Sequence, residues 1–446
     1  MAVWTTTPIS GLEDEHRLDA EYYHPEKKLL ARELDEFENV KLGTVAFITD
    51  GQHGYFKLDP VSEIRQITAK HIKASLVDKS RADRLSLHTH SKNLRSSLEP
   101  LDILVTTAGT IGRVGLVTED IPPANIDQDI ARIKILDDRI DPYFLWIYLQ
   151  TRFGQFQIER YTTGQVQYHL SLTKSRKIRV PLASWESDIA SIAKQGVESY
   201  QDSQALFTSA QALLESELGL DKLVFEKPVS YIARFSEVSA SHRNDAQHYR
   251  PRFEQLLSHL RQGEHAYLGL LKEWSRRGVQ PVYVDDGPID VINSQHLGKQ
   301  HLDYDGFAKT TQSEFMAHPE AHVRYGDILI YTTGAYIGRT NVYLSEKPAL
   351  ASNHVHILRL RGNDIDPAYM ALVLNTTVGA FQTEKHSRGS AQAELYPSDI
   401  AKFIVPIIAP EKQRQIGDKV RESLAAQNES KRLLEQAKQR VEELIE

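Results

Sequence analysis

The chain repeats itself after about 225 residues, and this repeat limits its possible folds more than any other feature. Leu101–Val117 reads LDILVTTAGTIGRVGLV, and Tyr325–Tyr343 reads YGDILIYTTGAYIGRTNVY. Asp102 matches Asp327 at a spacing of 225 positions. Each copy is much longer than a solenoid unit of a few dozen residues and is long enough to bury its own core. The sequence therefore predicts two globular blocks with a common fold.

The match extends well beyond this signature in both directions. Glycines, prolines and apolar positions persist between the copies, whereas polar positions differ. This pattern indicates one scaffold that presents two different surfaces. Matching segments include Ile67–Ile72 with Ile292–Leu297, Gly154–Gln157 with Gly379–Gln382, and Pro181 with Pro406.

Composition excludes several classes of protein. The 446 residues include no cysteine, which rules out disulfides and thiolate metal sites and fits a reducing cytoplasm. We find no secretory signal pattern at the start and no apolar run near the ~20 residues that span a membrane. The net charge is −7, yet Lys41–Pro181 holds 20 basic against 15 acidic residues, so the first block can present a basic face. The second block, Tyr267–Pro406, has 13 against 15.

Local patterns predict the elements of each block. Apolar residues at helical spacing predict one amphipathic helix over Pro142–Gln157. The glycine-rich signature is followed by strand-like residues, which favours a tight strand–strand connection over a phosphate-binding loop. Asp102 and Asp327 are interpreted as turn-stabilising carboxylates. Strands are predicted at Val40–Ile48, Ile64–Ile72, Asp102–Thr106, Arg113–Val117 and Ile130–Leu136.

Two segments without interior proline, Trp185–Leu220 and Pro410–Glu446, predict long helices, each about 50 Å at ~1.5 Å per residue. Each has one apolar stripe that must be buried, and the simplest partner is the other helix, packed antiparallel as a coiled coil. The predicted class is α+β, with two tandem homologous mixed α/β domains, each followed by a long helix. The expected domains are 1–182, 183–222, 223–406 and 407–446.

This organisation resembles the specificity subunit of type I restriction–modification systems. The resemblance rests on GDILIYTTGAYIG at Gly326–Gly338, on its copy at Leu101–Gly112, and on Pro410–Ile416, PEKQRQI. It implies that 1–182 and 223–406 are target recognition domains, each reading one half of a split site in double-stranded DNA. It also implies that the helices are spacers that dock methyltransferase subunits, two being expected, with restriction/translocase subunits joining. S-adenosylmethionine would then bind the partner methyltransferase, and this chain would need no cofactor.

Candidate DNA contacts are polar residues at matched positions, each weighed against a purely structural or solvated role. Arginine is the natural forked donor to phosphate, amides read adenine edges, and arginine and lysine favour guanine. The basic stretch of the first block is replaced by amides in the second, as two different half-sites would require. The candidates are Lys70, His71, Lys73, Arg81, Arg84, Arg113, Gln165, Gln167, Tyr168, Lys174, Asn293, Gln295, His296, Lys299, Arg339, Arg388, Ser390 and Gln392.

Catalytic patterns are missing from the sequence. We find no Walker motif, no methyltransferase catalytic run and no metal-ligand spacing, so no catalytic or metal site is predicted. The preferred interpretation is a non-catalytic DNA-recognition subunit, in which helix length fixes the gap between half-sites. The alternative is a protein–protein scaffold of a phage-defence complex, and steeply salt-dependent duplex binding would favour DNA. A self-contained enzyme is disfavoured.

Overall fold

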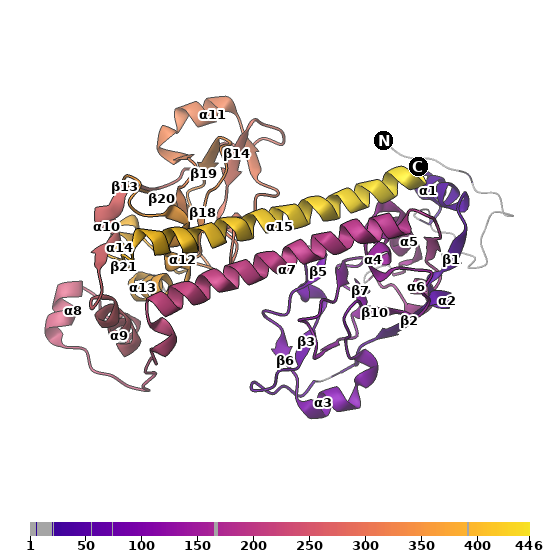
Figure 1. Cartoon of the computed structure of the whole chain (residues 1–446), viewed down its shortest axis with the longest axis horizontal. Coiled ribbons are helices and arrows are strands. Elements are labelled where there is room, and N and C mark those ends of the chain that lie inside the picture. The colour runs from indigo at the N-terminus through magenta and orange to yellow at the C-terminus, as the bar shows by residue number, and fades with distance from the viewer. Residues whose placement is uncertain are drawn as a thin grey trace. The chain divides into compact units, whose positions relative to one another are not determined.

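The computed structural model describes residues 6, 20, 22–54, 56–73, 75–164, 168–389 and 392–446. The chain forms two compact units, of which the first comprises Met1–Ser199 with Glu429–Glu446 and the second comprises Tyr200–Asn428. Each unit combines a mixed α/β domain with a part of both long helices (Figure 1). This confirms the predicted α+β class. Over the described residues, every helix is too short or too polar to traverse a lipid bilayer.

The first unit is built around a six-stranded sheet in the order β2-β10-β7-β8-β5-β4, beside a three-stranded sheet β6-β3-β9 and the pair β1-β11. Its helices are α1 (Pro25–Asp35), α2 (Leu42–Val45), α3 (Leu87–Lys92), α4 (Pro142–Tyr148), α5 (Arg152–Tyr161) and α6 (Leu172–Ser175). Its strands are β1 (Asn39–Lys41), β2 (Ala46–Asp50), β3 (Arg65–Ile67), β4 (Ile72–Lys73), β5 (Leu76–Val77), β6 (Asp83–Arg84), β7 (Ile103–Thr106), β8 (Val114–Leu116), β9 (Ala124–Ile126), β10 (Ile130–Ile135) and β11 (Arg179–Pro181).

The second unit contains the sheets β13-β20-β17-β18 and β15-β14-β19-β16, and the pair β12-β21. Its helices are α8 (Phe235–Ser241), α9 (Pro251–Leu260), α10 (Leu268–Leu271), α11 (Gln312–Ala317), α12 (Pro367–Asn375), α13 (Thr377–His386) and α14 (Pro397–Ile400). Its strands are β12 (His265–Tyr267), β13 (Lys272–Arg277), β14 (Ile289–Ile292), β15 (Ala308–Thr310), β16 (His322–Val323), β17 (Ile328–Tyr331), β18 (Thr340–Val342), β19 (Ala349–Ala351), β20 (Val355–Leu360) and β21 (Ile404–Pro406).

The two units share one topology. The order β2-β10-β7-β8 in the first unit reappears as β13-β20-β17-β18 in the second, and β6-β3-β9 reappears as β15-β14-β19. Each unit has one equivalent parallel pairing, β3 with β9 and β14 with β19. Equivalent amides also close each domain, since Gln157 exchanges two hydrogen bonds with the backbone of Arg179 and Gln382 does so with Ile404. The structure therefore confirms the duplication.

The long helices are α7 (Glu186–Glu217) and α15 (Pro410–Ile445). In the second unit, the Ser423 hydroxyl donates to the Ser203 carbonyl at 2.7 Å, and Lys412 pairs with Glu217 at 2.5 Å. Residue numbers rise on one helix as they fall on the other, so the helices are antiparallel, as predicted. In the first unit, a Cβ on Gly196 would lie 2.8 Å from the Leu434 side chain, so glycine permits a close approach there.

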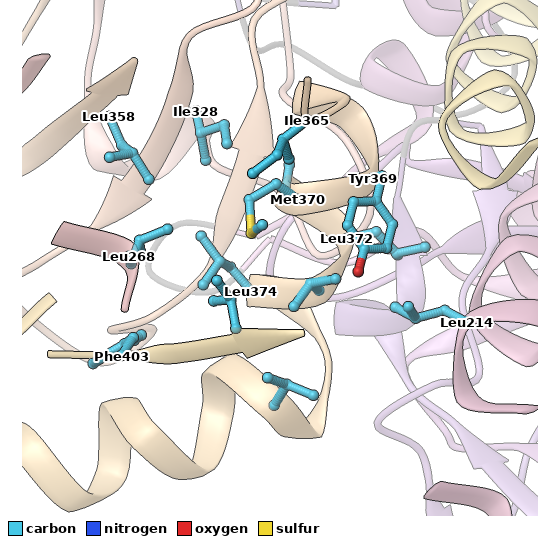
Figure 2. Packing of buried hydrophobic residues seen from close by; sticks show 14 of the residues in the cluster. Leu214, Leu268, Ile328, Leu358, Ile365, Tyr369, Met370, Leu372, Leu374 and Phe403 are labelled. Carbon is cyan, nitrogen blue, oxygen red and sulfur yellow. The ribbon is translucent and has the colours of Figure 1, made fainter. Parts of the chain in front are cut away.

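The core of the second unit surrounds α12, whose residues Ala368–Leu374 are all buried. Figure 2 shows Met370 and Leu374 of this helix among side chains from the sheet and neighbouring segments, including Ile328. Leu214 of α7 belongs to the same cluster, so the long helix is part of the core of this unit. A helix that is apolar all round needs burial on all sides.

The structure corrects the predicted single helix Pro142–Gln157, which is in fact two helices, α4 and α5. Thr151 caps the second helix by accepting a hydrogen bond from the Gly154 N–H at 3.4 Å. A Cβ on Gly154 would lie 2.5 Å from the Tyr148 carbonyl, so only glycine allows the chain to turn here. The second unit repeats the break between α12 and α13 at Gly379, whose Cβ would lie 1.9 Å from the Leu374 carbonyl.

A buried polar cluster joins the second domain to the helix pair. The His301 ring lies 2.7 Å from the Ser423 hydroxyl, and Gln300 donates to the Gln204 side chain at 2.8 Å. The His301 side chain also packs edge-on against Phe207. Burial lowers the pKa of His301 to about 4, so the ring is neutral at physiological pH.

Acidification should therefore weaken the second unit. Between pH 6.5 and 4 the unfolded chain binds a proton at His301 that the folded chain does not, so stability falls as pH falls through this window. Between pH 7.5 and 4.5, this one ring should lower the unfolding free energy of the wild type by about 2–3 kcal/mol, at ~1.4 kcal/mol per pKa unit. We expect His301→Gln to abolish that part of the decrease. Urea unfolding at both pH values measures it. The exposed His265, changed to Gln, is the matched control, and equal pH dependence in both variants would contradict the assignment.

Candidate nucleic-acid interface

Each copy of the signature is a tight antiparallel hairpin supported by a buried ion pair. The Asp102 carboxylate accepts from Arg132 Nε at 2.6 Å and from the Glu99 backbone N–H at 2.7 Å. Asp327 accepts from Arg359 at 2.7 and 2.8 Å. Burial raises the pKa of both carboxyl groups, and the arginine hydrogen bonds oppose that shift. The predicted turn-stabilising role of the two aspartates is confirmed.

The hairpin turns rest on glycines in the left-handed region. Gly112 has φ +84° and Gly338 has φ +87°. A Cβ on Gly112 would lie 2.9 Å from Gln155 Oε1, and one on Gly338 would lie 2.8 Å from the Thr383 side chain. Each turn is thus packed on the helix α5 or α13. The predicted strand–strand connection is confirmed, and the residue after each glycine is held in a defined place.

In the first unit that residue is Arg113, which is exposed and lines an open cleft of about 740 Å³. Lys73 from β4 and Lys438 from α15 line the same cleft, and we call it the cationic cleft. Lys73 and Lys438 each make a long ion pair, with Asp78 at 3.8 Å and with Glu435 at 3.6 Å. Three cations that converge on one cleft are suited to binding an anion such as phosphate.

Arg339, the equivalent residue of the second unit, is placed differently. Its guanidinium lies 3.7 Å from the centroid of the Tyr336 ring, and Nη1 donates to the Leu297 carbonyl at 3.4 Å. The side chain is half-buried. Because Arg339 is engaged within its own unit, the two copies differ in the charge they present beside the same turn.

His71 and His296, both predicted as DNA contacts, are buried. Their side chains are 3% and 4% exposed. Nδ1 of His71 accepts from the Thr68 backbone N–H at 2.9 Å, and Nδ1 of His296 accepts from Asn293 at 3.0 Å. Burial lowers the pKa of both rings. Each histidine caps a 3₁₀ turn, on which the preceding residue, Lys70 or Gln295, is exposed.

The basic stretch is largely at the surface. Lys70, Lys73 and Arg81 are exposed, whereas Arg84 donates to the Ser62 carbonyl at 2.9 Å and is half-buried. Two further candidate lysines differ, because Lys299 is exposed whereas Lys174 is half-buried and its pKa is lowered by burial.

The second unit has a polar cleft of about 390 Å³ around the 3₁₀ turn Ser294–His296, and we call it the amide cleft. Gln295 is exposed at this cleft, and Asn293 accepts from the Tyr283 hydroxyl at 3.0 Å. Among the described residues that line it there is no aspartate, glutamate, lysine or arginine. The full lining is Gln280, Tyr283, Asn293, Ser294, Gln295, Ala308, Ser352, Asn353 and His354.

The same place in the first unit is charged. Lys70 stands where the second unit has Gln295, and Asp127 stands where it has Ser352, both at the 225-residue spacing. Burial raises the pKa of Asp127 to about 6, and the positive charge of Lys70 opposes this shift. The two units therefore present different hydrogen-bonding groups from one backbone position.

The polar loops that follow α5 and α13 start and end beside the signature turns. The Leu170 N–H donates to the Thr107 carbonyl at 3.0 Å, and Leu395 donates to Thr332 at 2.9 Å. Tyr168 and Gln392 are exposed, and Arg388 lies 3.2 Å from the Asp399 carboxylate. The predicted residues Gln165, Gln167 and Ser390 lie outside the described residues.

Several residues of these clefts were missed from the sequence. Lys438 lies 325 positions after Arg113, and its own segment reads only as a charged helix face. Ser352 and Asn353 follow a buried strand, where uncharged residues look like an ordinary turn. Asp127 aligns with Ser352 in the repeat, and this loss of charge between copies was a detectable signal.

Comparisons with known proteins show what this chain is similar to. Residues 284–439 match the family described as type I restriction modification DNA specificity domain. The specificity subunit of the type I restriction enzyme EcoBI from Escherichia coli is 34% identical over 110 residues, which cover 25% of this chain and 23% of that protein. The chain thus spans about a quarter of the length of this curated relative.

Solved structures of specificity subunits also align over most of the chain. The S subunit from M. genitalium covers 92% of this chain and 95% of its own, with 14% identity and a TM-score of 0.45. The HsdS subunit from Thermoanaerobacter tengcongensis covers 91% and 95%, with 15% identity and a TM-score of 0.29. In sequence, residues 284–439 thus match the type I restriction modification DNA specificity domain, and part of the chain is similar to a specificity subunit of these systems.

Proposed function

We propose that this chain is the DNA sequence-specificity subunit of a type I restriction–modification complex and that it recognises a bipartite site. The observation that carries the proposal is the duplicated scaffold with unlike polar surfaces at equivalent positions. The cationic cleft of the first unit suits phosphate, and the amide cleft of the second unit suits base edges. Phosphate contacts would fix the position on the duplex, and base contacts would give the sequence preference.

We further propose that catalysis resides in partner subunits. Two methyltransferase subunits carrying S-adenosylmethionine would dock on the paired helices α7 and α15, and restriction/translocase subunits would join them. The exposed faces of both helices are rich in charged and amide side chains, and so remain accessible to a partner. This chain would contribute recognition and geometry but no reacting group.

The proposal is tested by selecting random duplexes with the full chain co-purified with its methyltransferase partner. Two short conserved sequences at a fixed gap, with a binding constant that falls steeply as salt rises, are expected. Methylation of an adenine or cytosine within the selected site would link recognition to the partner's chemistry. Salt-insensitive binding to partner proteins with no duplex affinity would favour a protein scaffold instead.

The spacing between half-sites should follow the length of the helices. Inserting seven residues, two helical turns of ~3.6 residues each, into both α7 and α15 lengthens each helix by about 10 Å. Because one base pair rises ~3.4 Å, we expect the selected gap to grow by about three base pairs, with both half-sites unchanged. Repeating the duplex selection measures this result. An unchanged gap would show that the length of the helices does not set the spacing between the half-sites.

A further inference from the structure

We infer that each unit binds a phosphate of the DNA backbone at the turn before its last strand, through Lys177 in the first unit and Lys402 in the second. The inference rests on the proposed DNA-binding function and adds to it two lysines that lie outside the cationic cleft and outside the predicted contacts. We call these turns, Lys174–Lys177 and Asp399–Lys402, the lysine turns.

The two lysine turns have the same backbone structure. The Lys177 N–H donates to the Lys174 carbonyl at 2.9 Å, and the Lys402 N–H donates to the Asp399 carbonyl at 3.1 Å. Each turn ends a short helix, α6 or α14, and leads into the last strand of its unit, β11 or β21. Lys177 and Lys402 stand at the 225-residue spacing, so this lysine is retained although many polar positions differ between the copies.

In the second unit one buried carboxylate holds two exposed cations. Asp399 Oδ1 lies 2.9 Å from Lys402 Nζ and 3.2 Å from Arg388 Nη2. The Asp399 side chain is 2% exposed, whereas those of Lys402 and Arg388 are 57% and 51% exposed. Because both cations pair with the same oxygen atom, they are held close together. Their two positive charges outweigh the single negative charge of the carboxylate.

This pair of cations keeps the donors that an oxyanion requires. An arginine side chain has five N–H donors and an ammonium group has three, and the hydrogen bonds to Asp399 use one donor of each cation. The free oxygens of a phosphate can therefore accept from both cations while Asp399 stays paired. The Glu394 carboxylate does not cancel this charge, because Arg277 pairs with it at 2.6 Å.

The first unit builds its cationic turn from different residues. Lys174 stands where the second unit has Asp399, and Thr163 stands where it has Arg388. Burial lowers the pKa of Lys174, and the positive charge of Lys177 lowers it further, so the two ammonium groups lie near each other. The second cation therefore comes from the helix in the first unit and from the loop in the second. In both units the retained lysine has a cationic neighbour.

The DNA backbone is assigned as the ligand because of what varies beside the turns. The polar loop after α5 or α13 closes shortly before each turn, since Thr163 pairs with His169 and Arg388 pairs with Glu394 through the backbone. The loop sequences differ between the copies, as residues that read two half-sites require. Phosphates are the same at every site, so a residue that binds them can persist while its neighbours change.

The test measures duplex binding over a salt series. It uses the full chain in complex with its methyltransferase and the duplex obtained by selection. The first variant is Lys402→Gln, which leaves Arg388 as the partner of Asp399. Loss of one phosphate contact should lower the slope of log K against log salt by about 0.9 in magnitude, which corresponds to roughly fivefold weaker binding at 0.15 M salt. Adding Lys177→Gln should double the change in slope and weaken binding by about thirtyfold.

Matched variants separate the charge of the lysine from its effect on folding. Lys402→Arg keeps the cation and should keep the wild-type slope. Lys194→Gln with Lys347→Gln removes one exposed lysine from each unit outside the lysine turns, and the slope should again stay that of the wild type. The melting temperature of Lys402→Gln should equal that of the wild type, because Arg388 still neutralises Asp399.

Three results would overturn the inference and leave the proposed function standing. The first is an unchanged slope in Lys402→Gln while the wild type binds the duplex with a steep slope. The second is weaker methyltransferase binding with unchanged duplex binding, since the ligand would then be an acidic protein surface. The third is an altered base preference without a change in slope, since the lysine would then contact a base. A wild-type complex without duplex affinity would overturn the proposed function itself, and this inference with it.

Discussion

Replacing Asp327 with alanine should lower the unfolding free energy of the second unit by about 3–5 kcal/mol, the typical cost of breaking a buried ion pair. The change leaves the Arg359 guanidinium, only 17% exposed, without the carboxylate that accepts its two hydrogen bonds. It also removes the acceptor of the Arg324 backbone N–H at 2.8 Å. Urea unfolding at pH 7.5 measures the loss.

Two further variants identify the cause of that loss. Asp286→Ala removes an exposed aspartate of the same unit and should change the free energy by less than about 0.5 kcal/mol. Combining Asp327→Leu with Arg359→Met removes both charges together and should recover most of the lost stability. A double variant as unstable as Asp327→Ala would show that shape, and not an unpaired charge, decides the result.

Neutralising the cationic cleft should weaken duplex binding by about a hundredfold at 0.15 M salt. The variant carries Lys73→Gln, Arg113→Gln and Lys438→Gln. If each cation neutralises one phosphate, the slope of log K against log salt falls by about 2.7 in magnitude, at ~0.9 per contact. At 0.15 M salt, a change of about 2.7 in this slope corresponds to the expected loss of about a hundredfold in duplex affinity. Kd measured over a salt series with the selected duplex tests both numbers.

The control must lose the same charge elsewhere on the first unit. Lys41→Gln, Arg139→Gln and Lys194→Gln neutralise three cations that do not line the cleft. We expect this variant to keep the wild-type slope within about one unit, since long-range effects are screened beyond ~8–10 Å. Similar losses in both variants would mean that net charge alone, and not the cleft, governs binding. Base preference should be unchanged in either case, because phosphate contacts carry no sequence information.

Much of the fold was predictable because the duplication repeats the local sequence patterns, so each pattern could be checked against its second copy. The hairpin after Asp102 could be predicted because the same glycines and carboxylate recur after Asp327, and the long helices because no proline interrupts them. The break between α4 and α5 was missed, since apolar spacing continues across it. What ends the helix there is a steric contact at Gly154, which periodicity does not report.

The candidate site was less predictable, because its geometry depends on packing between distant segments. A histidine beside two lysines resembles a surface cluster, and only the structure shows that His71 turns inward to cap a backbone N–H. Lys438 could not be assigned from its own segment, which is a charged helix face like any other.

The first unit draws Glu429–Glu446 from far along the chain, and this has a consequence for synthesis. Ile189, Ala193 and Val197 of α7 are buried in the complete unit, but the ribosome makes them more than 200 residues before the helix segment that joins them. Because synthesis runs at roughly 5–20 residues per second, the helix segment 429–446 is made on the order of 10–50 s after this apolar stripe. Until α15 is made, the nascent chain exposes this apolar stripe to solvent, and a premature stop in α15 would leave the first unit without the helix segment that completes it.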